Sequence, residues 1–175
     1  SAQPIQAGPP LRLPPGLGVP LGSETALTDL PVLETARLPL QGLWMAADAV
    51  GVTNQAGIAA PREWPLLWKS AQTAMPGLAL QALRLAEGGA PITLPQVSDG
   101  TAAKSIRVGR YGVPVSDRGA LRLYLAPSGS AAVLSASALL GIGYRRLAPE
   151  IEGRIVLVGR TDSAAGLDLE AQAIE

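Results

Sequence analysis

The most regular helical pattern in the chain lies between Pro76 and Gly89, in the stretch P-G-L-A-L-Q-A-L-R-L-A-E-G-G. Leu, Ala, Gln and Arg favour helix, proline suits the first helical turn, and Gly88 and Gly89 end the pattern. The spacing predicts that one face of this helix is buried. That face comprises Leu78, Ala79, Ala82, Leu83 and Ala86, with Leu80 and Leu85 beside it.

An earlier helix is predicted to begin near Pro39, run through L-Q-G-L-W-M-A-A-D-A-V and end at Gly51. Its apolar residues recur at helical spacing. They are Leu40, Leu43, Ala47 and Val50. Two short strands are predicted next, around G-V-T-N and around E-W-P-L-L-W. Pro65 places the second on a sheet edge or at a bulge, because proline cannot donate a backbone hydrogen bond.

The pattern then changes from helical spacing to alternation. The stretch S-I-R-V-G predicts a short strand, and G-V-P-V-S-D-R-G-A-L-R-L-Y-L predicts a hairpin. Its second strand alternates apolar Leu121, Leu123 and Leu125 with Arg122 and Tyr124, which is typical of a half-buried strand. Asp117, Arg118 and Gly119 supply the turn, in which Gly119 is free to adopt a positive φ.

The last regular elements are a helix through S-A-L-L-G, a turn through L-A-P-E-I-E-G and a strand over Ile155–Val158. Four unbroken branched apolar residues are typical of a central strand covered on both faces. The helix before it leaves room for a crossover connection, which would make this strand parallel to the previous one. The sequence therefore predicts an α/β fold, a mixed sheet with flanking helices and Ile155–Val158 as its central strand, in a single domain.

Residues 1–31 hold seven of the sixteen prolines, so residues 1–30 are predicted to be an extended arm ahead of a domain over residues 31–175. Three roles are open for the arm. It is a linker, a strap laid on the domain through Leu11, Leu13, Leu17 and Val19, or a ligand for a proline-recognition domain.

The amino-acid composition excludes several classes of function. Apolar residues make up 47% of the chain and charged residues 16%, which indicates a folded protein with a core. Fourteen basic and fourteen acidic side chains balance, which argues against nucleic acid or an anionic membrane surface as the main partner. The chain has no His and no Cys, which excludes His-based triads, thiolate nucleophiles and the usual zinc sites. We therefore expect no metal, no cofactor and no catalytic residue. The two lysines, Lys69 and Lys104, lie in no recognisable motif.

If Ile155–Val158 is a parallel strand, its carboxyl end delivers Arg160, Thr161 and Asp162 to the sheet edge where α/β proteins bind ligands. These three residues are the ligand-binding candidates, although an ordinary strand exit explains them as well. Turn chemistry accounts for Asp117 and Arg118.

The stretch G-I-G-Y-R-R over residues 141–146 resembles a glycine loop followed by a basic pair. The simpler interpretation is a helix end with arginines near its C-terminus. The tryptophans Trp44, Trp64 and Trp68 are interpreted as core anchors, or as an interface if Trp64 and Trp68 lie on an exposed edge.

Read in order, these landmarks resemble the type-2 CHASE domain, an extracytoplasmic sensory module of bacterial signalling proteins. The resemblance covers roughly Pro31 to Val158. Its landmarks are A-D-A-V-G-V-T-N, P-L-L-W, A-M-P-G-L-A-L-Q-A-L-R-L-A, I-R-V-G, G-V-P-V-S-D-R-G-A-L-R-L-Y-L, S-A-S-A-L-L-G and L-A-P-E-I-E-G-R-I-V-L-V-G. The family's opening part has no counterpart here, because the Pro-rich arm stands in its place. Glu170 occupies the position where the family often has a histidine, so no role of that histidine carries over.

The resemblance implies a non-enzymatic, ligand-responsive domain on the periplasmic side of the cytoplasmic membrane. It would belong to a receptor whose output kinase or nucleotide cyclase lies outside this chain, as in two-component signalling. The implied partners are a small-molecule or protein signal, adjoining transmembrane helices and a second copy in a homodimer.

Two alternatives remain open. One is a periplasmic structural or protein-interaction module, and the other is a His-free hydrolase or transferase that uses carboxylates. The receptor interpretation depends on Ile155–Val158 being shut inside a layered body of sheet and helix.

Overall fold

The computed structural model describes residues 18–34, 36, 38–53, 62–97, 104–124, 134–141 and 144–158. The chain divides into two compact units, where the sequence predicts a single domain. Unit 1 comprises Ser1–Asn54 and Pro65–Leu121, and unit 2 comprises Gln55–Trp64 and Arg122–Glu175. The described residues combine helices with antiparallel sheets, which agrees with the α/β class at a coarse level.

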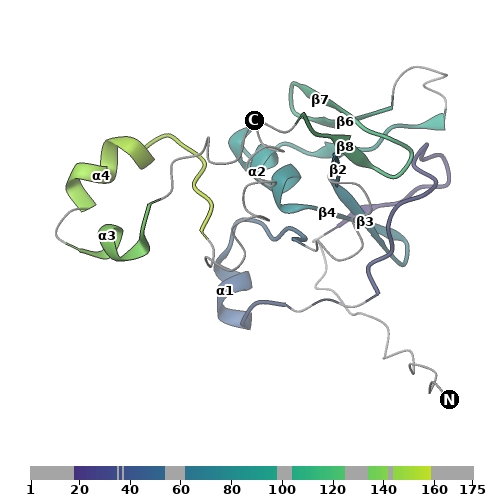
Figure 1. The fold of residues 1–175 in the computed structure, drawn as a ribbon. Helices are drawn as coiled ribbons and strands as arrows, with labels where there is room; N and C mark the ends of the chain where they lie inside the picture. The colour runs from purple at the N-terminus through teal and green to yellow at the C-terminus, as the bar shows by residue number, and fades with distance from the viewer. Residues whose placement is uncertain are drawn as a thin grey trace, which may run out of the picture. The chain divides into compact units, whose positions relative to one another are not determined.

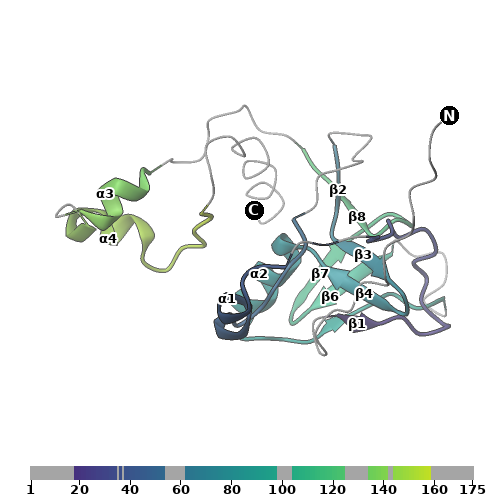
Figure 2. The ribbon, with the colours of Figure 1, turned by 90° about the horizontal axis from the view of Figure 1, so that it is seen from below.

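The first sheet of unit 1 has the order β1-β4-β3 and is antiparallel throughout (Figures 1 and 2). Its strands are β1 (Val19–Pro20), β3 (Leu67–Ser70) and β4 (Thr73–Pro76). β3 and β4 form a hairpin in which Ser70 pairs with Thr73. Because β1 belongs to this sheet, residues 18–20 of the predicted arm are laid on unit 1, as one of the roles predicted for the arm requires. Leu11, Leu13 and Leu17 lie outside the described residues.

The second sheet has the order β5-β6-β7 and is also antiparallel. It comprises β5 (Ile92–Thr93), β6 (Ser105–Val108) and β7 (Tyr111–Pro114). Ile106 and Val108 are 0% exposed, whereas Arg107 between them is exposed. The strand predicted from S-I-R-V-G is therefore confirmed, and its alternation places the two branched residues in the core.

The predicted hairpin after β6 is wrong, although strands form on both sides of its turn, because these strands do not pair with each other. β7 pairs with β6 through a two-residue turn at Gly109 and Arg110, and β8 (Ala120–Arg122) pairs with β2 (Glu63–Pro65). A Gly-X pair suits a tight hairpin turn, and Gly109 has φ +57°. The turn at Asp117–Gly119 thus joins strands of different sheets, and Gly119 adopts the expected positive φ of +63°.

Trp64 and Trp68 are core residues, with exposed fractions of 1% and 3%. Their predicted role as anchors is confirmed, and an exposed tryptophan edge is ruled out for this pair. Trp68 packs with Leu33 and Met75, and the half-buried Val52 lies against the cluster. The E-W-P-L-L-W stretch forms two strands rather than one, because a bend at Leu66 separates β2 from β3.

Helix α2 (Leu78–Ala86) confirms the most regular pattern in the sequence, and Gly88 and Gly89 follow it with positive φ. Two details differ: Pro76 belongs to β4, and the buried residues are Ala79, Leu80 and Gln81, with Leu85 and Ala86 exposed. The reason is that backbone bonds to Val52 hold the start of the helix: Val52 N–H donates to the Pro76 carbonyl, and Leu78 N–H donates to the Val52 carbonyl. Burial therefore concentrates at the first turn instead of following a stripe.

Helix α1 (Gln41–Ala46) is shorter than predicted and buries none of its residues. The backbone becomes extended at Ala47, so fewer than two turns form and the expected face has no length over which to pack. Leu40 is 78% exposed and Leu43 64% exposed, so their helical spacing does not bury them. Both views place α1 and α2 on the same side of the strands of unit 1 (Figures 1 and 2).

Unit 2 contains α3 (Ala136–Leu140) and α4 (Tyr144–Ile151). The helix predicted from S-A-L-L-G is confirmed as α3. The turn predicted through L-A-P-E-I-E-G is instead mostly helix, with Pro149 inside α4 and a turn at Glu152–Gly153 after it.

The prediction of a central strand at Ile155–Val158 is wrong. These residues form no strand, and Ile155, Val156 and Val158 are 49%, 47% and 84% exposed. A central strand needs a neighbour on each side and a layer over each face. No strand in the described part of the chain pairs with this segment, so its apolar composition alone does not bury it. The predicted parallel crossover is lost with it.

Candidate functional site

The segment 21–33, called the strap below, crosses unit 1 after β1 and is held along its length by backbone hydrogen bonds. Leu21 N–H donates to the Gln72 carbonyl at 2.9 Å, Ala26 N–H to the Pro95 carbonyl at 2.8 Å, and Leu33 N–H to the Lys69 carbonyl at 2.8 Å. Leu27, Leu30 and Leu33 are buried. The strap is therefore fixed at both ends and near its middle.

Charged side chains add two further attachments to the strap. The Lys104 ammonium donates to the Ala26 carbonyl at 2.8 Å and lies 2.6 Å from an Asp117 carboxylate oxygen. Arg118 and Asp29 form an exposed ion pair at 2.9 Å. Asp117 and Arg118 thus belong to a turn that also holds the strap, which agrees with the structural interpretation of this pair.

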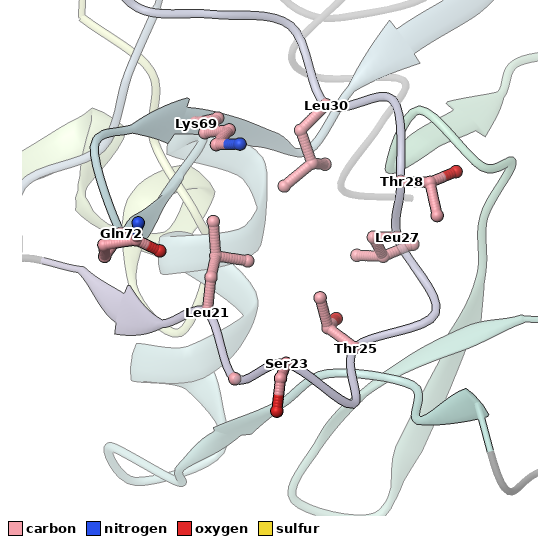
Figure 3. A pocket seen from close by; sticks show the side chains of 9 residues that line it. Leu21, Ser23, Thr25, Leu27, Thr28, Leu30, Lys69 and Gln72 are labelled. Atoms are coloured by element: carbon pink, nitrogen blue, oxygen red, sulfur yellow. The ribbon is translucent and has the colours of Figure 1, made fainter.

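The strap and the β3–β4 hairpin line an open hollow of about 260 Å³ (Figure 3). Lys69 comes from β3 and Gln72 from the hairpin turn, while the rest of the lining comes from the strap. The lining residues are Leu21, Gly22, Ser23, Thr25, Leu27, Thr28, Leu30, Lys69 and Gln72. Lys69 is the one charged residue among them.

The lining mixes polar and apolar side chains. Figure 3 shows Lys69, Gln72 and Leu21 on one side of the hollow, Leu27 on the opposite side, and Leu30 between them near the Lys69 ammonium. The Ser23 and Thr28 hydroxyls point away from it. The Thr25 hydroxyl donates to the Pro95 carbonyl at 3.4 Å. The groups that face the hollow are therefore one cation, one amide and three leucines.

The turn that carries Gln72 is strained. Ala71 has φ +53°, in the left-handed region that costs a residue with a Cβ atom about 1–2 kcal/mol. The neighbouring Gln72 carbonyl accepts the Leu21 N–H, so the strap and the strained turn are directly bonded. Such strain persists where the surrounding structure holds the turn, and it is common at binding sites.

A second cluster of charge lies outside the hollow, at the β6–β7 turn. Arg110 is 3.4 Å from a Glu87 carboxylate oxygen and donates to the Tyr111 hydroxyl at 3.3 Å. This hydrogen bond and the Glu87 charge raise the pKa of Arg110 above its usual value. The cluster therefore joins the β6–β7 turn to the end of α2.

The ligand candidates Arg160, Thr161 and Asp162 lie outside the described residues. Gly141 follows α3, as the helix-end interpretation of the glycine loop requires. The basic pair is placed differently: Arg145 and Arg146 lie in the first turn of α4 and are exposed, so they do not sit near a helix C-terminus. Within the described residues, no group of acidic side chains is arranged to hold a metal ion.

Sequence reasoning did not identify Lys69 as a site residue. The one signal available was its place as a charged residue directly after the predicted E-W-P-L-L-W strand. The described helices are all too short or too polar to cross a lipid bilayer. Comparison with protein-family models, with curated proteins and with solved structures found no match for the chain.

Proposed function

We propose that this chain is a periplasmic sensory domain of a bacterial transmembrane receptor, with its output kinase or nucleotide cyclase outside these residues. The observation that carries the proposal is the hollow between the strap and the β3–β4 hairpin, with one cationic side chain facing it. The ordered landmarks that resemble the type-2 CHASE domain support it independently. The receptor interpretation drawn from the sequence depended on a buried strand at Ile155–Val158, and that strand does not form. The proposal therefore rests on the hollow and on the ordered landmarks alone.

The mechanism follows from the attachments of the strap. A molecule in the hollow would contact the strap and the hairpin turn together, and would favour the arrangement in which their bonds are intact. A ligand shifts a conformational equilibrium only by its difference in affinity for the two states. The proposed signal is therefore a change in how firmly the strap is held, which adjoining membrane helices or a second copy in a homodimer would transmit.

The alternative is a protein-interaction module without a sensing role. It is favoured by the exposed apolar side chains on and before α1, namely Leu38, Leu40, Leu43 and Met45. Exposed apolar groups that lie close together are typical of protein–protein contact surfaces.

A topology experiment tests the location. These 175 residues contain no cysteine, so Gln41→Cys places their one thiol on the exposed surface of α1. The experiment uses the full-length protein with any cysteine outside these residues replaced by serine. We expect a membrane-impermeant maleimide to label this thiol in intact cells. Labelling that appears only after lysis would place the chain inside the cell and end the receptor proposal.

A stability screen separates sensing from simple interaction. A sensor should gain thermal stability from at least one small molecule, because a ligand that binds the folded state raises the melting temperature. An interaction module should respond to a protein partner and to no small molecule. The second result, together with loss of partner binding in Leu43→Ser, would favour the alternative.

A further inference from the structure

We propose that the hollow takes a small organic anion with a single carboxylate and a short apolar body, and that Lys69 and Gln72 bind the carboxylate. This inference rests on the proposed sensory function and specifies the chemical class of its signal. It follows from three properties of the hollow: its charge, its size and the leucine side chains in its lining.

The charge of the hollow comes from Lys69. It is the one charged residue of the lining, and none of the ion pairs among the described residues includes it. The other lysine, Lys104, already contacts Asp117 and the Ala26 carbonyl. A single ammonium matches one carboxylate, and such charge-assisted hydrogen bonds are the stronger ones in proteins.

The position of Lys69 is fixed by its backbone. Its N–H donates to the Pro31 carbonyl at 2.8 Å, and its carbonyl accepts the Leu33 N–H at 2.8 Å. The strap therefore holds the base of the side chain on one edge of β3, while β4 pairs with the other. Gln72, beyond the strained Ala71, adds an amide donor on the same side of the hollow.

Size and polarity restrict the rest of the ligand. The hollow of about 260 Å³ lies just below the range of about 300 to 1,000 Å³ that is usual for small-molecule sites, so the ligand is a small metabolite. Leu21, Leu27 and Leu30, all from the strap, supply apolar side chains to the lining. They suit a short hydrocarbon body and offer no partner to a second charge.

Inorganic phosphate fits this arrangement less well. Phosphate sites gather several backbone N–H groups or more than one cation. A neutral apolar ligand also fits poorly, because it would remove water from the ammonium without replacing its hydrogen bonds. These two classes are the rivals that the experiment must separate from a monocarboxylate.

The test titrates the complete 175-residue chain with butyrate, its neutral isostere butyramide and inorganic phosphate by calorimetry. Four proteins are compared: the native chain, Lys69→Met, Lys69→Arg and Arg107→Met. Arg107 is exposed on β6 outside the hollow, so its replacement removes the same charge elsewhere. Circular dichroism melting establishes that each variant is folded, which we expect because the Lys69 side chain is exposed and its backbone bonds remain.

We expect butyrate to bind the native chain at least roughly tenfold more tightly than butyramide or phosphate. Lys69→Met should lose that preference, Lys69→Arg should retain part of it, and Arg107→Met should leave it unchanged. Butyrate binding that survives in folded Lys69→Met, or equal binding of butyramide, would overturn the inference. Lys69-dependent binding of phosphate alone, or no binding of any of the three, would also overturn it. The maleimide experiment decides the sensory location separately, so either proposal can fail without the other.

Discussion

Two apolar stretches of the chain have opposite environments. In β6, Ile106 and Val108 alternate with polar neighbours and are completely buried. In the segment Ile155–Val158 every residue is apolar, yet three of the four are at least 47% exposed. The less hydrophobic stretch is the buried one. The difference is that β6 has β5 on one side and β7 on the other, whereas no described strand pairs with the second segment.

This contrast shows what burial requires. Alternation specifies which face of a strand is apolar, and a tight turn such as Gly109–Arg110 brings the partner strand into register. A continuous apolar run specifies neither a face nor a partner. Its hydrophobic free energy is realised only when another part of the fold covers it.

Truncation of the two stretches should give the largest difference. We expect Ile106→Ala to lower the free energy of unfolding by about 3 kcal/mol, because it leaves a cavity in a fully buried site. Ile155→Ala should change it by less than about 0.5 kcal/mol, as for an exposed position. Urea unfolding of both variants measures the difference. Similar losses in the two would mean that Ile155 is also a core residue.

The next comparison is between two glycines with a positive φ, Gly119 in unit 1 and Gly153 in unit 2. A Cβ atom on Gly119, at φ +63°, would lie 2.6 Å from Leu30 Cδ2, so Gly119→Ala should cost about 2–3 kcal/mol through backbone strain and overpacking. Gly153 has φ +74° with nothing near its Cβ position, and Gly153→Ala should cost about 1 kcal/mol from strain alone. Thermal melting of the two variants checks the order, and a larger cost at Gly153 would contradict it.

The two ion pairs that attach the strap, Lys104–Asp117 and Arg118–Asp29, should contribute differently to stability. Lys104→Met removes the contact with Asp117 and the hydrogen bond to Ala26, and we expect a loss of about 1–2 kcal/mol because the ammonium is partly buried. Arg118→Met removes an exposed pair with Asp29 and should cost less than about 0.5 kcal/mol. Unfolding at low and high salt measures both losses. Equal losses would show that Lys104 does not hold the strap.

The smallest effect concerns the strained turn. Ala71→Gly should raise the free energy of unfolding by up to about 1 kcal/mol, because glycine adopts a positive φ without the Cβ penalty. Ala86→Gly, at the exposed end of α2, is the control and should lower it by about 0.5–1 kcal/mol. A loss of stability in Ala71→Gly would mean that the turn is not strained in solution.

Local features of the fold could be predicted from the sequence. The helix over Leu78–Ala86, the strand with Ile106 and Val108, and the positive φ of Gly119 follow from propensity, alternation and turn chemistry. Features that depend on distant partners could not. The pairing of β8 with β2 and the burial of the first turn of α2 are set by contacts between residues far apart in the chain.

The same distinction applies to the candidate site. The hollow exists because the strap bonds to Gln72, Pro95 and Lys69, which lie 36 to 69 residues from their partners along the sequence. No local sequence motif predicts these bonds. The sequence predicted ligand contacts at Arg160, Thr161 and Asp162 from a parallel strand, and that strand does not form. Lys69 has no motif around it, so its place beside the hollow emerges only from the fold.

Hydrogen exchange of backbone amides tests the central claim most directly, because it compares the two apolar stretches in one sample. We expect slow exchange at Ile106 and Val108, close to the limit set by global unfolding. We expect fast exchange at all four amides of Ile155–Val158. Equally slow exchange in both stretches would show that Ile155–Val158 is a paired strand, and would contradict the fold described above.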